Sequence, residues 1–268
     1  MCEQTMNNKP IFIVGCPRSG TTLLRVILDS HPNICSGPET HLIVPINNLY
    51  NYTTKNWMLL EPFGLKKEEF ERKISEVLSV FTENYTTLKN KKRWAEKTPN
   101  NIFYLDFIYK IFPNCQIINI IRDGRDVVTS LKNRRGFTVE PYIIRKWNQS
   151  IRLTLKYREL FDKNTYYEVR YEDLVTNPEV ELKKIMRFLQ EEWTPVLLNH
   201  NKVEHDYWFK DKKISKNDSK IGKNINRHSP SRPIFNQSIG KWKEDLNIFE
   251  KIFTTICLKN NLRKMGYK

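Results

Sequence analysis

The chain has 268 residues, 39% of them hydrophobic and 12% aromatic, which is typical of a globular protein with one sizeable core. It contains no long uncharged apolar run, and this excludes a membrane-spanning helix. Its 45 lysines and arginines outnumber its 30 aspartates and glutamates, and the net charge of +15 means that a polyanionic partner has to be considered. We expect a single domain over residues 1–268.

The first predicted elements are a strand, a loop and a helix. Ile11–Val14 is apolar and predicts a buried parallel strand that ends at Gly15. The segment Thr21–Leu28 has helical periodicity with its apolar side inward. A helix N-terminus at the carboxyl end of a buried strand presents unpaired N–H groups and the positive end of the helix dipole. The sequence therefore predicts an anion site at this turn.

The loop of this turn resembles the phosphate-binding loop of ATPases, without its lysine. Gly15–Thr22 spells GCPRSGTT, in which Thr21 takes the place of the lysine in the template G-x-x-x-x-G-K-[ST]. That lysine contacts the β and γ phosphates, so its absence disfavours ATP, GTP and a nucleotide kinase. Arg18 offers a planar guanidinium suited to a terminal oxyanion. A shorter nucleotide anion is the predicted ligand.

A helical insertion is predicted over about residues 40–92. Glu39 and Thr40 stand at the start of an apolar pattern that resumes from Leu42, which indicates a helix. Lys66–Tyr85 predicts an amphipathic helix. Its expected core-facing residues are Phe70, Ile74, Val77, Leu78 and Phe81.

Two later strands end near charged or polar residues. The strand ending at Lys97 is followed by a helix to residue 111, and a lysine at that end points toward the ligand crevice of an open α/β sheet. Cys115–Ile121 is the next buried strand. The helix after it places Asp126, Ser130 and Arg134 four residues apart, on one face that can look into the crevice.

The remaining pattern continues the alternation of strands and helices. A helix over 140–161, a strand over 165–169, a helix over 178–189 and a closing helix over 246–262 are predicted. Residues 200–240 are expected to form a lid-like loop. This alternation is the signature of a parallel, doubly wound α/β domain.

Several features argue against other classes of function. The histidines lack metal-ligand spacings, so no metal is expected, and the densest basic stretch, residues 210–224, is typical of a solvated loop rather than of a nucleic-acid site. The amino terminus leaves no room for a signal sequence, and we expect a cytoplasmic protein without a membrane partner. Scattered cysteines without a C-x-x-C pair are predicted to be reduced thiols: Cys2, Cys16, Cys35, Cys115 and Cys257.

Three separated motifs now agree: PRSGTT, GPETH and IIRDGRDVVTS. Together they resemble the sulfotransferases that use 3'-phosphoadenosine 5'-phosphosulfate (PAPS), and most closely the tyrosylprotein sulfotransferase-like branch, as a soluble bacterial member. The resemblance covers nearly the whole chain. It implies a P-loop-NTPase-like parallel sheet flanked by helices, and PAPS as cofactor with adenosine 3',5'-bisphosphate (PAP) as its product.

The resemblance also implies which residues hold the nucleotide. Arg18–Thr22 corresponds to the 5'-phosphosulfate loop, and Arg122 with Ser130 corresponds to the 3'-phosphate motif. Ser231 is an alternative to Ser229, because the correspondence is loose there. The implied nucleotide-binding residues are Arg18, Ser19, Gly20, Thr21, Thr22, Arg122, Ser130, Arg134, Tyr171, Ser229 and Lys241.

The implied catalytic residues are Glu39, Lys97 and Arg18. Glu39 would act as general base, while Lys97 and Arg18 would hold the sulfuryl oxygens in a metal-independent in-line displacement. His41 stands where tyrosine-sulfating members have an arginine, and the sequence shows no counterpart of their membrane anchor. We therefore expect a small-molecule acceptor with a hydroxyl or an amine, natural products included. The alternatives are a peptide or protein tyrosine, a P-loop nucleotide kinase and a polyanion-binding protein.

Overall fold

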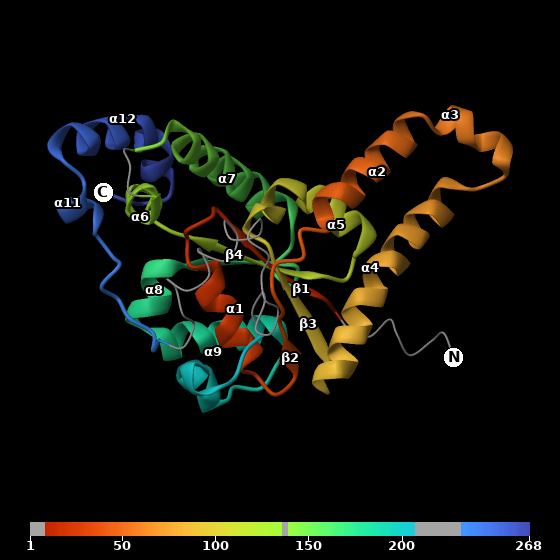
Figure 1. The fold of residues 1–268 in the computed structure, drawn as a ribbon, viewed down its shortest axis with the longest axis horizontal. Coiled ribbons are helices and arrows are strands. Elements are labelled where there is room, and N and C mark those ends of the chain that lie inside the picture. Colours follow the sequence, from red (N-terminus) through yellow and green to blue (C-terminus); the bar gives the residue numbers. More distant parts are fainter. Residues whose placement is uncertain (1–8, 136–138, 207–231) are drawn as a thin grey trace, which may run out of the picture.

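The computed structural model describes residues 9–135, 139–206 and 232–268, and its centre is one parallel sheet (Figure 1). The strand order is β2-β3-β1-β4-β5. The strands are β1 Ile11–Gly15, β2 Ile34–Cys35, β3 Arg93–Lys97, β4 Gln116–Ile121 and β5 Tyr166–Arg170. The chain passes from β1 to β2 and β3 on one side of β1, and then to β4 and β5 on its other side. The carboxyl end of β1 therefore lies at the switch point, where open α/β sheets bind ligands.

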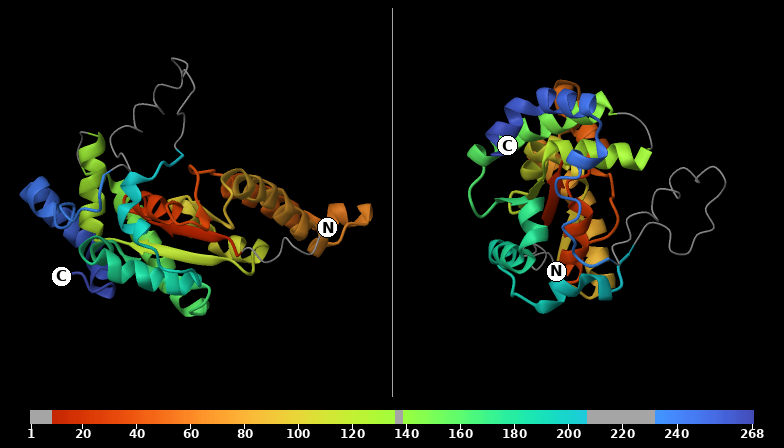
Figure 2. Two further views of the ribbon diagram at one scale, coloured as in Figure 1. Left: turned by 90° about the horizontal axis from the view of Figure 1, so that it is seen from below. Right: turned by 90° about the vertical axis from the view of Figure 1, so that its left-hand side faces the viewer.

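Helices cover both faces of the sheet (Figure 2). The α-helices are α1 Thr21–Asp29, α2 Ile43–Lys55, α3 Trp57–Leu60, α4 Lys67–Lys89, α5 Leu105–Ile111, α6 Gly124–Arg135, α7 Pro141–Leu160, α8 Tyr171–Thr176, α9 Pro178–Leu189, α11 Trp242–Asp245 and α12 Ile248–Lys264. Short 3₁₀ helices are η2 Glu61–Phe63, η3 Pro99–Tyr104 and η4 Pro195–Lys202. The predicted alternation of strands and helices is thus present, with α8 and the two-residue β2 as additions.

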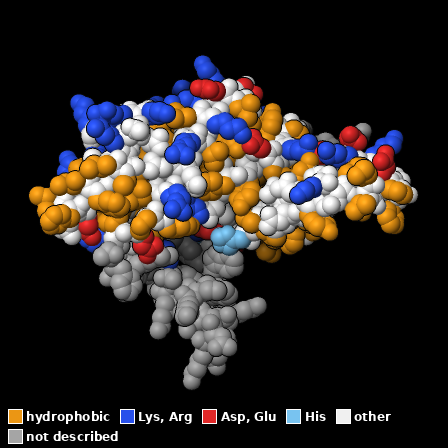
Figure 3. Space-filling model, turned by 90° about the horizontal axis from the view of Figure 1, so that it is seen from above, with side chains coloured by type: hydrophobic (Ala, Val, Ile, Leu, Met, Phe, Trp, Pro, Cys, Tyr) orange, Lys and Arg blue, Asp and Glu red, His pale blue; other side chains and the backbone are white. Residues whose placement is uncertain are grey.

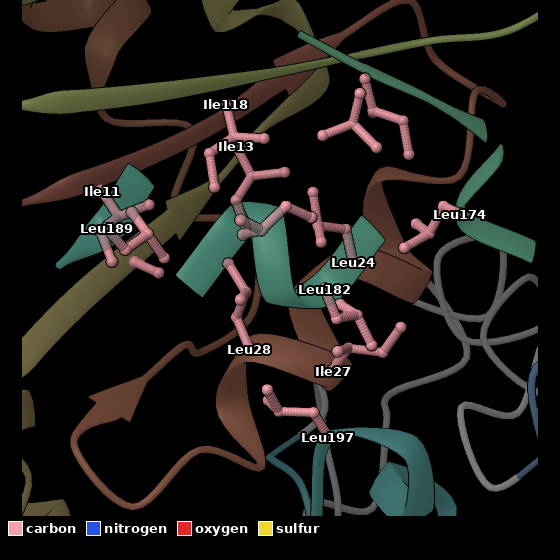
Figure 4. Close-up of a cluster of buried hydrophobic side chains, with 14 of the residues drawn as sticks. Ile11, Ile13, Leu24, Ile27, Leu28, Ile118, Leu174, Leu182, Leu189 and Leu197 are labelled. Carbon is pink, nitrogen blue, oxygen red and sulfur yellow. The ribbon is translucent and has the colours of Figure 1, made fainter. Parts of the chain in front are cut away.

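The alternation of side chains along β1 divides the core into two layers. Ile11 and Ile13 pack with residues of α1, α9 and η4 on one face, as Figure 4 shows. Phe12 and Val14 pack on the other face with residues of η3, α4 and α5. Successive residues of a strand point to opposite faces, so a continuous apolar run marks a strand covered on both sides. A third cluster joins α6, α7 and α12.

The predicted insertion forms a helical arm, which we define as α2, α3, η2 and α4 (Figure 1, upper right). The predicted core face of α4 is only partly correct. Ile74 and Leu78 are buried, whereas Val77 and Phe81 are each 52% exposed. The arm reaches beyond the edge of the sheet, so only a narrow stripe of α4 meets other elements.

The start of α2 also differs from the prediction. Glu39 and Thr40 lie in the loop before the helix, and α2 begins at Ile43. His41 has φ of 54°, a left-handed conformation that cannot continue a right-handed helix. Glu39 is therefore held by a turn.

The predicted lid over 200–240 falls largely on residues 207–231, which lie outside the described residues. For the part of the chain that is described, no helix is both long and apolar enough to cross a membrane.

Candidate active site

The loop between β1 and α1 fits closely between its neighbours. At Gly20, with φ of 98°, a Cβ atom would lie 2.5 Å from a ring carbon of Tyr171. At Gly15, with φ of 147°, it would lie 2.4 Å from the carbonyl oxygen of Ile120. Only glycine combines these backbone angles with such close approaches. No side chain caps the N-terminus of α1, so its first N–H groups remain available to an anion.

Arginines from three segments meet beside this loop. Arg18 Nε and Nη2 donate hydrogen bonds to Ser130 Oγ at 3.2 and 3.1 Å. Arg122 Nη1 donates to the carbonyl oxygen of Arg18 at 3.0 Å. Burial, and then the like charges of Arg134 and Arg122, lower the pKa of Arg18 to about 10. We call Arg18, Arg122 and Arg134 the arginine cluster. Their mutual repulsion would be relieved by a bound anion.

Arg122 also anchors the far wall of this region. Its guanidinium lies 4.4 Å from the centre of the Tyr171 ring, and Nη2 donates to the carbonyl oxygen of Ser238 at 2.6 Å. Two polar atoms here are buried without a partner among the described residues, namely Arg122 Nε and Ser19 Oγ. Such atoms are costly unless a ligand or water satisfies them. The predicted residues therefore fit the phosphate groups of a nucleotide.

A second group lies at the end of β3, and we call Glu39, Lys97, Thr22 and His41 the transfer group. Lys97 is 4% exposed, and its Nζ contacts Glu39 Oε1 directly and Thr22 Oγ1 at 3.4 Å. The other oxygen of Glu39 lies 3.5 Å from His41 Nε2. Burial lowers the pKa of Lys97, although Glu39 opposes this change. A carboxylate and an ammonium group thus stand together at the carboxyl edge of the sheet.

The structure distributes the predicted site residues between these two groups. It brings Glu39 and Lys97 together, and it brings Arg18, Arg122, Ser130 and Arg134 together. Arg18 was predicted both to bind the nucleotide and to take part in the transfer step. Its described contacts are with Ser130 and Arg122, on the side of the arginine cluster. Ser229 and its alternative Ser231 lie outside the described residues.

The late segment that carries Lys241 is tethered by a residue that the sequence did not single out as an anchor. Asp126 accepts hydrogen bonds from the backbone N–H groups of Gly240 at 2.8 Å and Trp242 at 3.0 Å. Lys241 is thereby placed close to α6, with its side chain exposed. The sequence did contain a signal for this role, because Asp126 shares with Ser130 the helical face that was predicted to look into the crevice.

Glu96, next to Lys97 in β3, was missed. It is 2% exposed, and its Oε1 accepts hydrogen bonds from Thr98 Oγ1 at 2.6 Å and Thr40 Oγ1 at 3.1 Å. Burial raises the pKa of Glu96 to about 7. A glutamate inside an otherwise buried strand was the signal, since an acid in that position needs partners.

Other candidate sites receive less support. Within the described ranges, no three His, Cys, Asp or Glu side chains are grouped so that they could hold a metal ion. Burial raises the pKa values of Cys16, Cys35 and Cys115 to about 12, which disfavours reactive thiolates. A hollow of about 390 Å³ lies beside β5, and none of the predicted site residues lines it.

Comparison with known proteins adds a family to this geometry. The profile of the sulfotransferase family matches residues 10–195. Protein-tyrosine sulfotransferase A of Caenorhabditis elegans is 32% identical over 202 residues, covering 72% of this chain and 53% of that protein. Protein-tyrosine sulfotransferase 1 of Homo sapiens is 31% identical over 206 residues, covering 72% and 54%. The chain spans about half the length of these curated relatives.

Solved structures are similar over almost the whole chain. A sulfotransferase domain from the curacin biosynthetic pathway gives a TM-score of 0.66 at 22% identity, covering 97% of this chain and 98% of that one. Mouse sulfotransferase SULT7A1, solved with PAP, gives 0.51 at 15% identity, covering 96% and 85%. These likenesses confirm the predicted fold class.

The comparisons also correct one prediction. The expected cytoplasmic location is wrong, because the matching relatives are animal protein-tyrosine sulfotransferases, which do not support it. That expectation rested on a short amino terminus and on the lack of an apolar segment. The ends of a chain that spans half of its relatives carry no information about location.

Proposed function

Since the chain belongs to the sulfotransferase family, we propose that it transfers the sulfuryl group of PAPS to the phenol hydroxyl of a tyrosine in a peptide or protein. The observation that carries the proposal is the Glu39–Lys97 pair beside the open N-terminus of α1. The names of the relatives favour tyrosine over the small-molecule acceptor that the sequence suggested. His41 was one of two arguments for a small molecule, and it says little about acceptor size; the other, the missing membrane anchor, does not concern the acceptor.

The arginine cluster would hold the 3'-phosphate of the donor. Arg122 and Ser130 are implied for this role by the family motif, and Arg134 adds a further positive charge. Ser19 Oγ and the first N–H groups of α1 would bind the 5' end. The ring of Tyr171, packed against Gly20 and Arg122, would line the adenosine.

The transfer group would carry out the proton chemistry. Bound PAPS supplies an activated sulfuryl group whose sulfur is attacked in line by the acceptor oxygen. Glu39 takes the phenol proton as the new O–S bond forms, and the bond between sulfur and the 5'-phosphate oxygen breaks. Lys97 neutralises the charge that develops on the leaving phosphate. The products are the tyrosine sulfate ester and PAP.

The proposal is tested by identifying the acceptor. The protein is incubated with sulfur-labelled PAPS and three acceptors: a tyrosine peptide, its phenylalanine counterpart and a small phenol. We expect label on the tyrosine peptide, none on the phenylalanine peptide and at most slow transfer to the phenol. Preferred labelling of the small phenol would contradict the acceptor assignment. No transfer by a protein that binds PAP would contradict the activity itself.

A further inference from the structure

Two consecutive residues of β3 hold the turn that carries Glu39 from opposite sides. Lys97 contacts the carboxylate of Glu39, whereas Glu96 accepts a hydrogen bond from the hydroxyl of Thr40, the next residue of the turn. Neighbouring residues of a strand project to opposite faces, so these are independent contacts. The base is therefore held directly through its own carboxylate and indirectly through the side-chain hydroxyl of the next residue, Thr40.

The hydroxyl of Thr40 continues this link into helix α2. A hydroxyl has one proton to donate, and Thr40 gives it to Glu96 at 3.1 Å. Its oxygen then accepts the backbone N–H of Leu42 at 3.4 Å, at the start of α2. A continuous chain of hydrogen bonds thus runs from Thr98 through Glu96 and Thr40 to the first turn of the helix.

The turn needs such support because its backbone is strained. His41 has φ of 54°, and a non-glycine residue in this region costs on the order of 1 kcal/mol. Strained residues persist where surrounding contacts fix them. Without the Thr40–Glu96 bond the turn could relax, and Glu39 would move relative to Lys97 and Thr22.

We propose that Glu96 is a positioning residue, which fixes the general base Glu39 through the hydroxyl of Thr40. The inference rests on the proposed function, in which Glu39 is the base. The hydrogen bonds of Glu96 go to Thr40 and Thr98, so its proposed effect on transfer is exerted through Thr40. Its charge is expected to change near neutral pH, because burial raises its pKa, while Thr98, Thr40 and Lys97 lower it and Glu39 raises it further.

The first test compares variants that keep or remove the link. Thr40→Val keeps the shape of the side chain and removes the hydroxyl, whereas Thr40→Ser keeps the hydroxyl. Glu96→Gln keeps the size and one acceptor oxygen but removes the negative charge, which weakens the hydrogen bond from Thr40. We expect Thr40→Val and Glu96→Gln to lower kcat about tenfold with unchanged KM for PAPS, and Thr40→Ser to restore most of the rate. Thr82→Val is the matched control, because Thr82 of α4 is half-buried like Thr40 and its hydroxyl bonds, among the described residues, only the carbonyl oxygen of Ser79 in its own helix.

A double variant tests whether the two residues act as one unit. If Glu96 acts through Thr40, the combined Glu96→Gln and Thr40→Val variant loses no more rate than either change alone. Losses that multiply would overturn the link. The wild-type rate should also fall as pH drops through about 7, and this limb should vanish in Glu96→Gln.

A measurement independent of activity separates this inference from the proposed function. Amide hydrogen exchange over residues 39–42 should quicken in Glu96→Gln and Thr40→Val and stay slow in Thr40→Ser and Thr82→Val. Unchanged exchange in the first two variants overturns the inference even if the wild type transfers sulfuryl groups. Quickened exchange in a protein that transfers nothing would support the positioning link while contradicting the proposed function.

Discussion

Arg122 joins three segments that are distant in the sequence. It follows β4, bonds the backbone of Arg18 in the first loop, bonds Ser238 in the late segment and lies over the ring of Tyr171. Its Nε remains buried without a described partner. A guanidinium that supports the walls of a site and still has one unused donor is well suited to a phosphate.

Arg122→Ala should therefore weaken PAP binding strongly. Loss of one buried charge-assisted contact costs about 2–4 kcal/mol, or roughly 30-fold to 1000-fold in Kd. Titration calorimetry with PAP measures the change, with Arg187→Ala on the exposed face of α9 as control. Equal PAP affinity in Arg122→Ala and the control would exclude Arg122 from the nucleotide site.

Glu96 gives a pH-dependent contribution to folding whose sign follows from its burial. Its pKa rises from 4.5 to about 7 in the folded chain, so the folded state binds more protons than the unfolded state between these values. Stability must then fall as pH rises through this window, by about 3 kcal/mol at most. Urea unfolding at pH 4.5 and pH 8 measures the free energy of unfolding, which should decrease between these pH values more in the wild type than in Glu96→Gln. A difference in unfolding free energy between the two proteins that is the same at both pH values would contradict a raised pKa.

At the scale of elements, the turn from β1 into α1 organises the site. Gly20 has a positive φ and is in contact with Tyr171, whereas Gly64 has a positive φ and no atom within 4 Å of the point where a Cβ would lie. The two glycines share the backbone requirement and differ in the available space. This pair allows strain and steric conflict to be separated.

Gly20→Ala should cost more stability than Gly64→Ala. Both changes carry a backbone penalty of about 1 kcal/mol, but only Gly20→Ala also forces the Tyr171 ring to move. We expect a larger loss of unfolding free energy and weaker PAP binding in Gly20→Ala alone. Urea unfolding measures the unfolding free energy and calorimetry measures the PAP affinity. Equal effects of the two changes would mean that Gly20 is not in close contact with the Tyr171 ring.

Elements with strong local signals were predictable, and those fixed by distant contacts were not. The apolar run of β1, its glycine and the periodicity of α1 predicted a strand, a loop with an anion site, and a helix. The strand predicted to end at Lys97 placed this lysine at the edge of the sheet where ligands bind. The exposure of Val77 and Phe81 depends on where the arm ends relative to the sheet, which periodicity does not report. Glu96 depends on Thr40, 56 residues away, so its partner could not be read locally.

At the scale of the whole molecule, the net charge of +15 could suggest a nucleic-acid partner. Figure 3 shows lysines and arginines dispersed over the visible face among apolar side chains rather than gathered in one stripe. Three positive charges do meet in the arginine cluster, where Arg122 is buried and Arg18 and Arg134 are half-buried. On the face shown, the charges form no continuous stripe that could follow a nucleic-acid backbone, whereas the arginine cluster suits the phosphate of a nucleotide.

Nucleotide binding should stabilise the whole fold, because the site joins β1, α6, α8 and the late segment. At a concentration of one hundred times Kd, PAP should add about 2.7 kcal/mol to the unfolding free energy. ATP, which lacks the 3'-phosphate, should add much less, and magnesium should not change the PAP result. Thermal unfolding measures these shifts, and equal stabilisation by ATP would point to a nucleotide kinase.

In the proposed reaction, Glu39 removes the proton of a tyrosine hydroxyl during sulfuryl transfer from PAPS. A single-turnover experiment with saturating PAPS and the tyrosine peptide, comparing the wild type with Glu39→Gln, tests it most directly. We expect one PAP and one sulfated tyrosine for each wild-type turnover, and a rate lowered by roughly 10²-fold to 10⁴-fold in Glu39→Gln with normal PAP affinity. A Glu39→Gln rate above about one tenth of the wild-type rate would contradict this role of Glu39.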